Sequence, residues 1–311
     1  MTRYSKALPQ LGGDLFLVYL GMETDLIFSQ GVDLPGFASY PLLETKEGRA
    51  HLRRYFHDMI DLGRAKGAGV ILESPTWVAN RDRAAGIGYA PETLRARNIE
   101  AIELMASVRE ECPDLPTVLS ASIGPRTDAY APSDIMAADE AERYHSEQIE
   151  VLASTSTDMI GAYTLAYPEE AIGMVRAAQT FDLPIAVSFT VETDGCLPTG
   201  ASLRDAIEAT DQATDGYASY FLVNCAHPDH FTGILTQESW MRRLKGVVAN
   251  ASRCSHAELD EAEELDAGNP LELGRQLAEI YTHHPNITIL GGCCGTDMRH
   301  MRAIAQAVRT P

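Results

Sequence analysis

Three cysteines stand out in this sequence because of what surrounds them. Cys293 and Cys294 are adjacent in the segment GGCCG (291–295), and Cys225 ends the apolar run YFLVNC (220–225). Zinc binds thiolates at about 2.3 Å in a tetrahedral array, and three protein ligands leave the fourth position free for a substrate. The flanking glycines give the backbone freedom to turn both neighbouring side chains toward one metal. These residues are therefore candidate ligands of a catalytic zinc ion.

A thiolate-rich zinc site suits one chemistry in particular. Three negative charges weaken the metal as a Lewis acid, but the metal still lowers the pKa of a further thiol and leaves it nucleophilic. The natural reaction is alkyl transfer to that sulfur. The alternative interpretation is that the cysteines are buried and pack as small hydrophobic side chains. A disulfide-exchange enzyme is disfavoured because the sequence contains no Cys-x-x-Cys motif.

The chain has the alternation of strands and helices that could position these cysteines. Short apolar runs without strict alternation are typical of parallel strands covered on both faces. Amphipathic stretches lie between them, with Pro168 expected to open one helix and Asp297 to cap the last. We expect strands at 16–21, 69–74, 117–124, 158–164, 184–190, 220–225, 244–252 and 287–294.

Eight strands, each followed by a helix or loop, predict a (β/α)₈ TIM barrel. A doubly wound sheet would need a glycine-rich phosphate loop after an early strand, and LGMETDL (20–26) is not one. We expect a single domain over residues 1–311. In a barrel the active face is formed by the carboxyl ends of the strands. Cys225, Cys293 and Cys294 then meet at one face, which favours metal ligands over separate buried thiols.

Composition narrows the class of protein further. The formal charge is −19, from 44 acidic and 25 basic residues, so nucleic-acid and membrane partners are not expected. There is no signal-peptide pattern or membrane-length apolar run, so we expect a cytoplasmic protein whose six cysteines form no disulfide framework. The acidic stretch 256–270 is expected to be a solvated loop or helix face.

The chain resembles the zinc-dependent homocysteine S-methyltransferase family over nearly its whole length. The resemblance rests on GGCCGT (291–296), VNCAHP (223–228), SIGP (122–125), PEEA (168–171) and the pattern SFT…DG…G from residue 188. It implies a barrel with one zinc ion held by Cys225, Cys293 and Cys294, with Asn224 beside the first ligand. The family transfers a methyl group from betaines, S-methylmethionine or methylated folate to homocysteine, which implies methionine biosynthesis.

The sequence departs from the family where the acceptor would bind. The first strand of family members typically ends in Asp-Gly-Gly, and here the equivalent residues are Tyr19, Leu20 and Gly21. Many members carry a glutamate for the substrate ammonium after the fourth strand, where this chain has Tyr163. Because an unpaired buried ammonium is costly, other acids must substitute or the acceptor is not homocysteine.

Three glutamates near strand ends are the candidate substitutes: Glu23, Glu73 and Glu192. Tyr19 and Tyr163 are core tyrosines or, together with Trp77, line a cage for a sulfonium or quaternary ammonium donor.

We therefore predict a methyltransferase that uses Zn²⁺, a small thiol acceptor and a small methyl donor; a homo-oligomer is compatible with this prediction. The alternatives are the same chemistry with a thiol that lacks the amino group, and a non-catalytic zinc-binding barrel.

Overall fold

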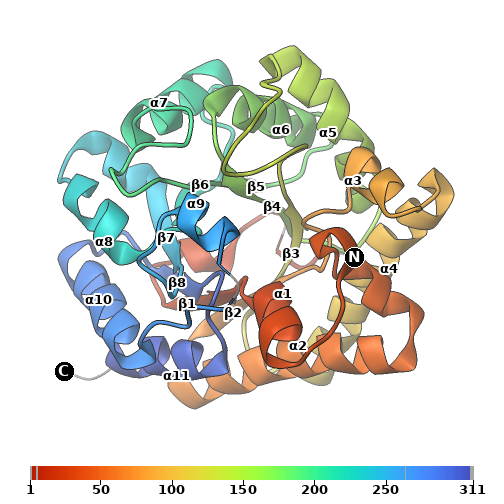
Figure 1. The fold of residues 1–311 in the computed structure, drawn as a ribbon, viewed down its shortest axis with the longest axis horizontal. Helices are drawn as coiled ribbons and strands as arrows, with labels where there is room; N and C mark the ends of the chain where they lie inside the picture. Colours follow the sequence, from red (N-terminus) through yellow and green to blue (C-terminus); the bar gives the residue numbers. More distant parts are fainter. Residues whose placement is uncertain (1, 5, 263, 309–311) are drawn as a thin grey trace.

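A computed structural model describes residues 2–4, 6–262 and 264–308. Its eight parallel strands pair in chain order, and β1 pairs with both β2 and β8, so the sheet closes (Figure 1). The predicted (β/α)₈ barrel is confirmed. The strands are β1 (Phe16–Tyr19), β2 (Gly69–Glu73), β3 (Thr117–Ile123), β4 (Met159–Leu165), β5 (Ile185–Phe189), β6 (Tyr220–Asn224), β7 (Leu244–Ala249) and β8 (Ile289–Gly292).

The strands are buried at every residue except Lys245, which is half-buried. One face of each strand points into the barrel and the other is covered by helices, so both faces select apolar side chains. Each predicted strand overlaps the observed one, and the predicted ends lie up to three residues away. The largest differences are at β7 and β8, where the prediction continued into the loops that carry polar residues and cysteines.

Helices surround the ring of strands (Figure 1). Pro168 begins α6 and Asp297 caps α11 as predicted, and the Asp297 carboxylate accepts from the backbone of Arg299 and His300. The helices are α1 (Met22–Thr24), α2 (Lys46–Lys66), α3 (Arg81–Gly86), α4 (Pro91–Glu111), α5 (Ala138–Ala153), α6 (Pro168–Thr180), α7 (Leu203–Ala213), α8 (Pro228–Phe231), α9 (His256–Asp260), α10 (Pro270–His283) and α11 (Met298–Ala307).

The apolar core has two main layers. The larger one lies between strands and helices, and the smaller one includes side chains from alternate positions of the strands, such as Phe16 and Val18. Cys225 and Cys293 belong to the smaller layer, so both sulfurs lie where the barrel interior meets the loops. Among the described residues, no helix combines the length and the apolar character that crossing a membrane requires.

Candidate active site

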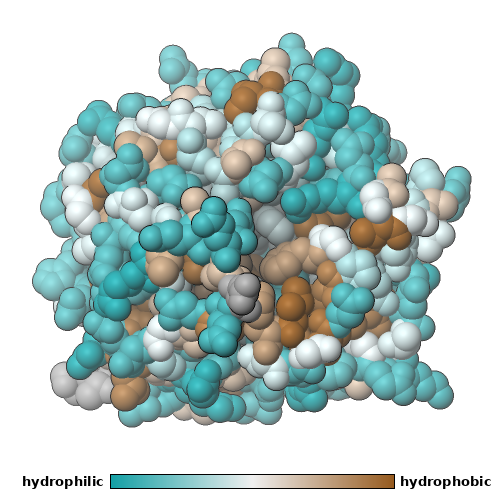
Figure 2. Space-filling model, in the orientation of Figure 1, coloured by the Kyte–Doolittle hydropathy of each residue, from teal (hydrophilic) through white to brown (hydrophobic). Residues whose placement is uncertain are grey.

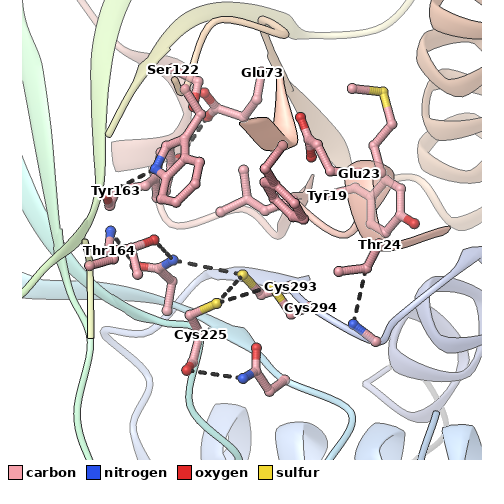
Figure 3. A pocket seen from close by; sticks show the side chains of 18 of the residues that line it. Tyr19, Glu23, Thr24, Glu73, Ser122, Tyr163, Thr164, Cys225, Cys293 and Cys294 are labelled. Atoms are coloured by element: carbon pink, nitrogen blue, oxygen red, sulfur yellow. Dashed lines mark hydrogen bonds between the residues drawn. The ribbon is translucent and has the colours of Figure 1, made fainter. Parts of the chain in front are cut away.

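The sulfur atoms of Cys225, Cys293 and Cys294 come together at the carboxyl ends of β6 and β8 (Figure 3). Cys225 Sγ lies 3.0 Å from Cys293 Sγ and 3.4 Å from Cys294 Sγ, and all three atoms lie within 4.8 Å of one another. Cys225 and Cys293 are buried, and Cys294 is half-buried. Two strands distant in sequence but close in the barrel thus place three soft ligands at one point.

This donor set fits a zinc ion. Sulfurs at 2.3 Å from a tetrahedral centre lie about 3.8 Å apart, so Cys225 Sγ would have to move away from Cys293 Sγ by about 0.8 Å and from Cys294 Sγ by about 0.4 Å to fit the metal. Hydrogen bonds with Cys293 and Cys294 hold the pKa of the Cys225 thiol well below its usual value. Burial raises the pKa of Cys293, and the Cys225 hydrogen bond raises that of Cys294. The three thiols therefore share their protons as one coupled group.

The backbone of Cys225 is held in a conformation that is rare for a side-chain-bearing residue. Its φ is +57°, in the left-handed region. Its carbonyl oxygen accepts from Asn250 Nδ2 at 3.0 Å and from His256 Nε2 at 2.7 Å. Backbone strain of this kind persists only where the surroundings over-determine it, and it clusters at functional sites.

Tyr130 and His256 were not singled out from the sequence, yet both belong to the cluster. The Tyr130 hydroxyl lies 2.9 Å from Cys225 Sγ, and its ring stacks on His256 with centroids 4.0 Å apart. His256 Nδ1 contacts Glu192 Oε1 at 2.8 Å. Both ring nitrogens thus contact oxygen atoms, which fixes the ring of His256 beside Tyr130.

Asn224, the residue before the first cysteine, joins three strand ends. Its Oδ1 accepts from the Thr164 backbone at 2.9 Å and from Ser188 Oγ at 2.7 Å. Its Nδ2 donates to Thr164 Oγ1 at 2.8 Å and lies 3.8 Å from Cys293 Sγ. Thr164 has a φ of +64° at the irregular end of β4, so Asn224 fixes a second strained residue.

A cavity of about 440 Å³ opens beside the sulfurs. Apolar side chains gather around the hollow of this face, within a largely hydrophilic surface (Figure 2). Trp77 Nε1 donates to the Tyr163 carbonyl at 3.2 Å, and Tyr19 donates to the Thr296 carbonyl at 3.0 Å. The aromatic residues that line the cavity are Tyr19, Phe28, Phe37, Tyr55, Phe56, Trp77, Tyr130 and Tyr163.

Glu73 and Tyr163 form a buried pair in this cavity. The Tyr163 hydroxyl donates to Glu73 Oε1 at 2.6 Å, and Oε2 has no hydrogen-bond partner among the described residues. Burial raises the pKa of Glu73 to about 7, against the lowering effect of the Tyr163 hydroxyl. Burial and then the Glu73 charge raise the pKa of Tyr163 well above its usual value. The carboxyl group of Glu73 therefore lies beside Tyr163, the position at which many family members carry a glutamate.

The other sequence candidates lie in different environments. Glu23 lines the cavity and accepts from Ser39 Oγ at 2.6 Å, and burial raises its pKa. Glu192 is absent from the cavity lining and reaches the site only through His256. Gly21 does not line the cavity either; a Cβ there would lie 2.6 Å from the Cys293 carbonyl oxygen.

The acidic stretch at 256–270 differs from the expectation of a purely solvated segment. Apart from residue 263, which lies outside the described residues, it includes α9 and seven residues that line the cavity. The segment turns back over the carboxyl ends of the strands and so reaches the cavity. Its acidic composition does not indicate this path. The seven are His256, Leu259, Asp260, Ala262, Glu264, Leu265 and Asp266.

A comparison of the sequence with known families decides the assignment. The family described as Homocysteine S-methyltransferase matches residues 21–308, nearly the full chain. The chain belongs to the homocysteine S-methyltransferase family. The three clustered cysteines and the barrel thus lie in a member of a methyltransferase family, as the sequence motifs predicted.

The chain is also similar to a protein from Rattus norvegicus at low sequence identity. Betaine–homocysteine S-methyltransferase 1 of Rattus norvegicus is 23% identical over 254 residues, which are 76% of this chain and 60% of that protein. The chain thus matches less than two thirds of that relative's length.

Solved structures show the same fold. The homocysteine methyltransferase MmuM of Escherichia coli, in its oxidized form, has a TM-score of 0.73 at 18% identity, covering 98% of this chain and 99% of that one. Its metallated form has a TM-score of 0.71 at 19% identity, covering 94% and 96%.

Proposed function

We propose that this protein transfers a methyl group from a small cationic donor to a small thiol, with homocysteine as the first candidate acceptor. The observation that carries the proposal is the meeting of Cys225, Cys293 and Cys294 beside a 440 Å³ cavity. Family membership supports methyl transfer as the reaction class. A cavity of this size also favours a catalytic protein over a non-catalytic zinc-binding barrel.

The three cysteines would hold one zinc ion, which supplies the positive charge that keeps an acceptor sulfur ionised and nucleophilic at neutral pH. Around it, Asn224 and the Tyr130 hydroxyl orient Cys293 and Cys225 through their sulfur contacts. The acceptor sulfur attacks the methyl carbon, and the electron pair of the broken bond remains on the donor. The proton of the acceptor thiol would leave to solvent when the thiol binds, so the transfer itself needs no general base.

The aromatic wall gives a physical reason for a cationic donor. Trp77 and Tyr19 line the cavity, and a sulfonium or quaternary ammonium held over an aromatic ring there would gain about 0.5–2 kcal/mol. Methyl transfer from such a cation to a thiolate removes both charges. A water-poor aromatic cavity therefore disfavours the charged reactants more than the transition state.

The acceptor ammonium has two carboxyl groups available in the cavity. Glu73 Oε2 is buried without a hydrogen-bond partner, and Glu23 has its Oε1 on Ser39. These two residues take the place of the acids that the family resemblance leads one to expect at Tyr19 and Tyr163. A thiol without an amino group remains the second candidate, because the Tyr163 hydroxyl already occupies one oxygen of Glu73.

The test follows a labelled methyl group in three preparations: zinc-loaded protein, protein treated with a chelator, and the Cys294→Ala variant. We expect methylated homocysteine only with zinc-loaded wild-type protein, from a betaine or sulfonium donor. Comparing homocysteine with thiols that lack the amino group separates the two acceptor candidates. Full activity in metal-free protein would refute the proposal.

A further inference from the structure

Arg83 is a cation in the cavity wall without an acidic partner. It lies on α3, lines the cavity and is half-buried. Its Nη1 is buried and has no hydrogen-bond partner, and no carboxylate of the described residues lies within ion-pair distance of its guanidinium. The neighbouring Trp77 ring lies 5.4 Å from the guanidinium carbon. Burial lowers the pKa of Arg83, as expected of a charge without compensation.

The lack of a carboxylate partner distinguishes Arg83 from the other buried and half-buried arginines of this acidic protein. Every other described arginine that is buried or half-buried pairs with a carboxylate. These arginines are Arg49, Arg53, Arg97, Arg109, Arg126, Arg176 and Arg243.

Asp128 is the carboxylate whose charge acts most on Arg83, yet it does not pair with it. Asp128 is exposed, and its Oδ1 accepts from the backbone of Tyr130 at 2.7 Å and of Ala131 at 2.8 Å. The loop that carries Tyr130 is thereby fixed, and the Arg83 donors remain free.

Chemistry limits what such a cation would bind. A guanidinium offers a planar fork that matches a carboxylate, and partial burial strengthens the contact. Asp260, Glu264 and Asp266 also line the cavity, so a doubly charged phosphate would meet repulsion there. A singly charged carboxylate on a molecule that also carries a positive group fits both the arginine and these acids.

We infer that Arg83 binds the carboxylate of a substrate, a conclusion that rests on the proposed function of this cavity. Trp77 holds the guanidinium by its ring, and Tyr130 connects this wall to the cysteines through its hydroxyl contact with Cys225. The substrate carboxylate thus lies on the α3 side of the cavity, and its reactive group extends to the sulfurs.

The test uses Trp77 as a reporter, because the chain has only two tryptophans and Trp240 does not line the cavity. Fluorescence titrations of the zinc-loaded protein compare carboxylates with matched neutral derivatives. The acceptor series is homocysteine and 3-mercaptopropionate against their amides, and the donor series is glycine betaine against its methyl ester. The proteins are wild type, Arg83→Gln, Arg83→Lys and the control Arg81→Gln, which changes an exposed arginine of the same helix.

We expect wild type to bind the carboxylate form about tenfold more tightly or better in at least one series. Arg83→Gln should abolish that preference and leave affinity for the neutral form unchanged, and Arg81→Gln should match wild type. Arg83→Lys keeps the positive charge but not the planar fork of donors, so its preference for the carboxylate form should lie between those of wild type and Arg83→Gln. A partial preference in this variant shows that the loss in Arg83→Gln does not come from unfolding. Loss of preference in the acceptor series assigns the carboxylate to the thiol, and loss in the donor series assigns it to the methyl donor.

A preference that survives in Arg83→Gln in both series, or its absence from wild type, overturns the inference. A separate titration of the cobalt-substituted protein with the same thiols reports on the proposed function. If no thiol changes the cobalt spectrum, the proposed function fails, while the fluorescence result still decides whether Arg83 selects a carboxylate.

Discussion

At the scale of single residues, the sequence identified the sulfur cluster but not all of its neighbours. Cys293 and Cys294 are conspicuous because adjacent thiols between glycines have few structural uses. Tyr130, Arg83 and His256 lie in loops or short helices, and their approach to the site depends on contacts between distant segments. The type of a residue in a loop does not indicate whether the loop brings it close to the site.

Glu73 gives a prediction about pH. In the folded protein its pKa is about 7, whereas the unfolded value is near 4.5, so the folded chain binds more protons between these values. The contribution of Glu73 to stability is complete below the unfolded pKa and is lost as the pH rises through 7. Relative to Glu73→Gln, wild type should lose about 3 kcal/mol of unfolding free energy across this window.

Urea unfolding of both proteins at a series of pH values measures the difference. Parallel pH profiles for wild type and Glu73→Gln would show that Glu73 ionises normally in the folded protein.

Tyr130 gives a prediction about metal affinity. Its hydroxyl lies 2.9 Å from Cys225 Sγ, and donation to that sulfur stabilises the thiolate form. Losing one such hydrogen bond costs about 0.5–1.5 kcal/mol, so Tyr130→Phe should bind zinc roughly 2- to 10-fold more weakly. Competition with a chromophoric chelator measures the change. Tyr89→Phe is the control, because Tyr89 bonds Glu44 and does not line the cavity; equal zinc affinity in wild type and Tyr130→Phe would contradict the assigned role.

At the scale of elements, the barrel was predictable and the site geometry only in part. Strands buried on both faces read as continuous apolar runs, so all eight were located from the sequence. Glu192 was grouped with the site because it follows the fifth strand. The chain instead turns it toward His256, and the sequence does not encode the direction of a loop in any simple pattern.

Gly21 tests how closely β1 and β8 must approach at the site. A Cβ at Gly21 would lie 2.6 Å from the Cys293 carbonyl oxygen and 2.6 Å from Thr296 Oγ1. Gly21→Ala should therefore displace the turn after β8, lower the unfolding free energy by about 1–3 kcal/mol and weaken zinc binding. Gly86→Ala is the matched control, since a Cβ there meets nothing within 4 Å.

Thermal unfolding and zinc content report both effects of Gly21→Ala. An alanine variant with unchanged stability and full zinc content would show that the turn adjusts freely.

At the scale of the whole molecule, the barrel also depends on a buried ion pair distant in sequence from the sulfur ligands. Asp158 precedes β4 and is fully buried, where it pairs with Arg109 and accepts from the backbone of Leu119 at 2.9 Å. Asp158→Ala would leave the Arg109 charge buried without a partner. We expect it to lower the unfolding free energy by about 3–5 kcal/mol.

The exposed pair of Asp61 and Arg64 provides the comparison, and Asp61→Ala should cost less than about 1 kcal/mol. Chemical denaturation measures both variants. Similar costs for the two substitutions would mean that the buried pair is not needed to hold the barrel together.

The central claim is that Cys225, Cys293 and Cys294 hold a metal ion to which the thiol acceptor binds. The most direct measurement is the absorption spectrum of the cobalt-substituted protein during titration with homocysteine. We predict sulfur-to-cobalt charge-transfer bands that intensify saturably as a fourth thiolate joins the three cysteines, with no such bands in Cys225→Ala. A cobalt spectrum that homocysteine and other thiols leave unchanged would contradict the claim.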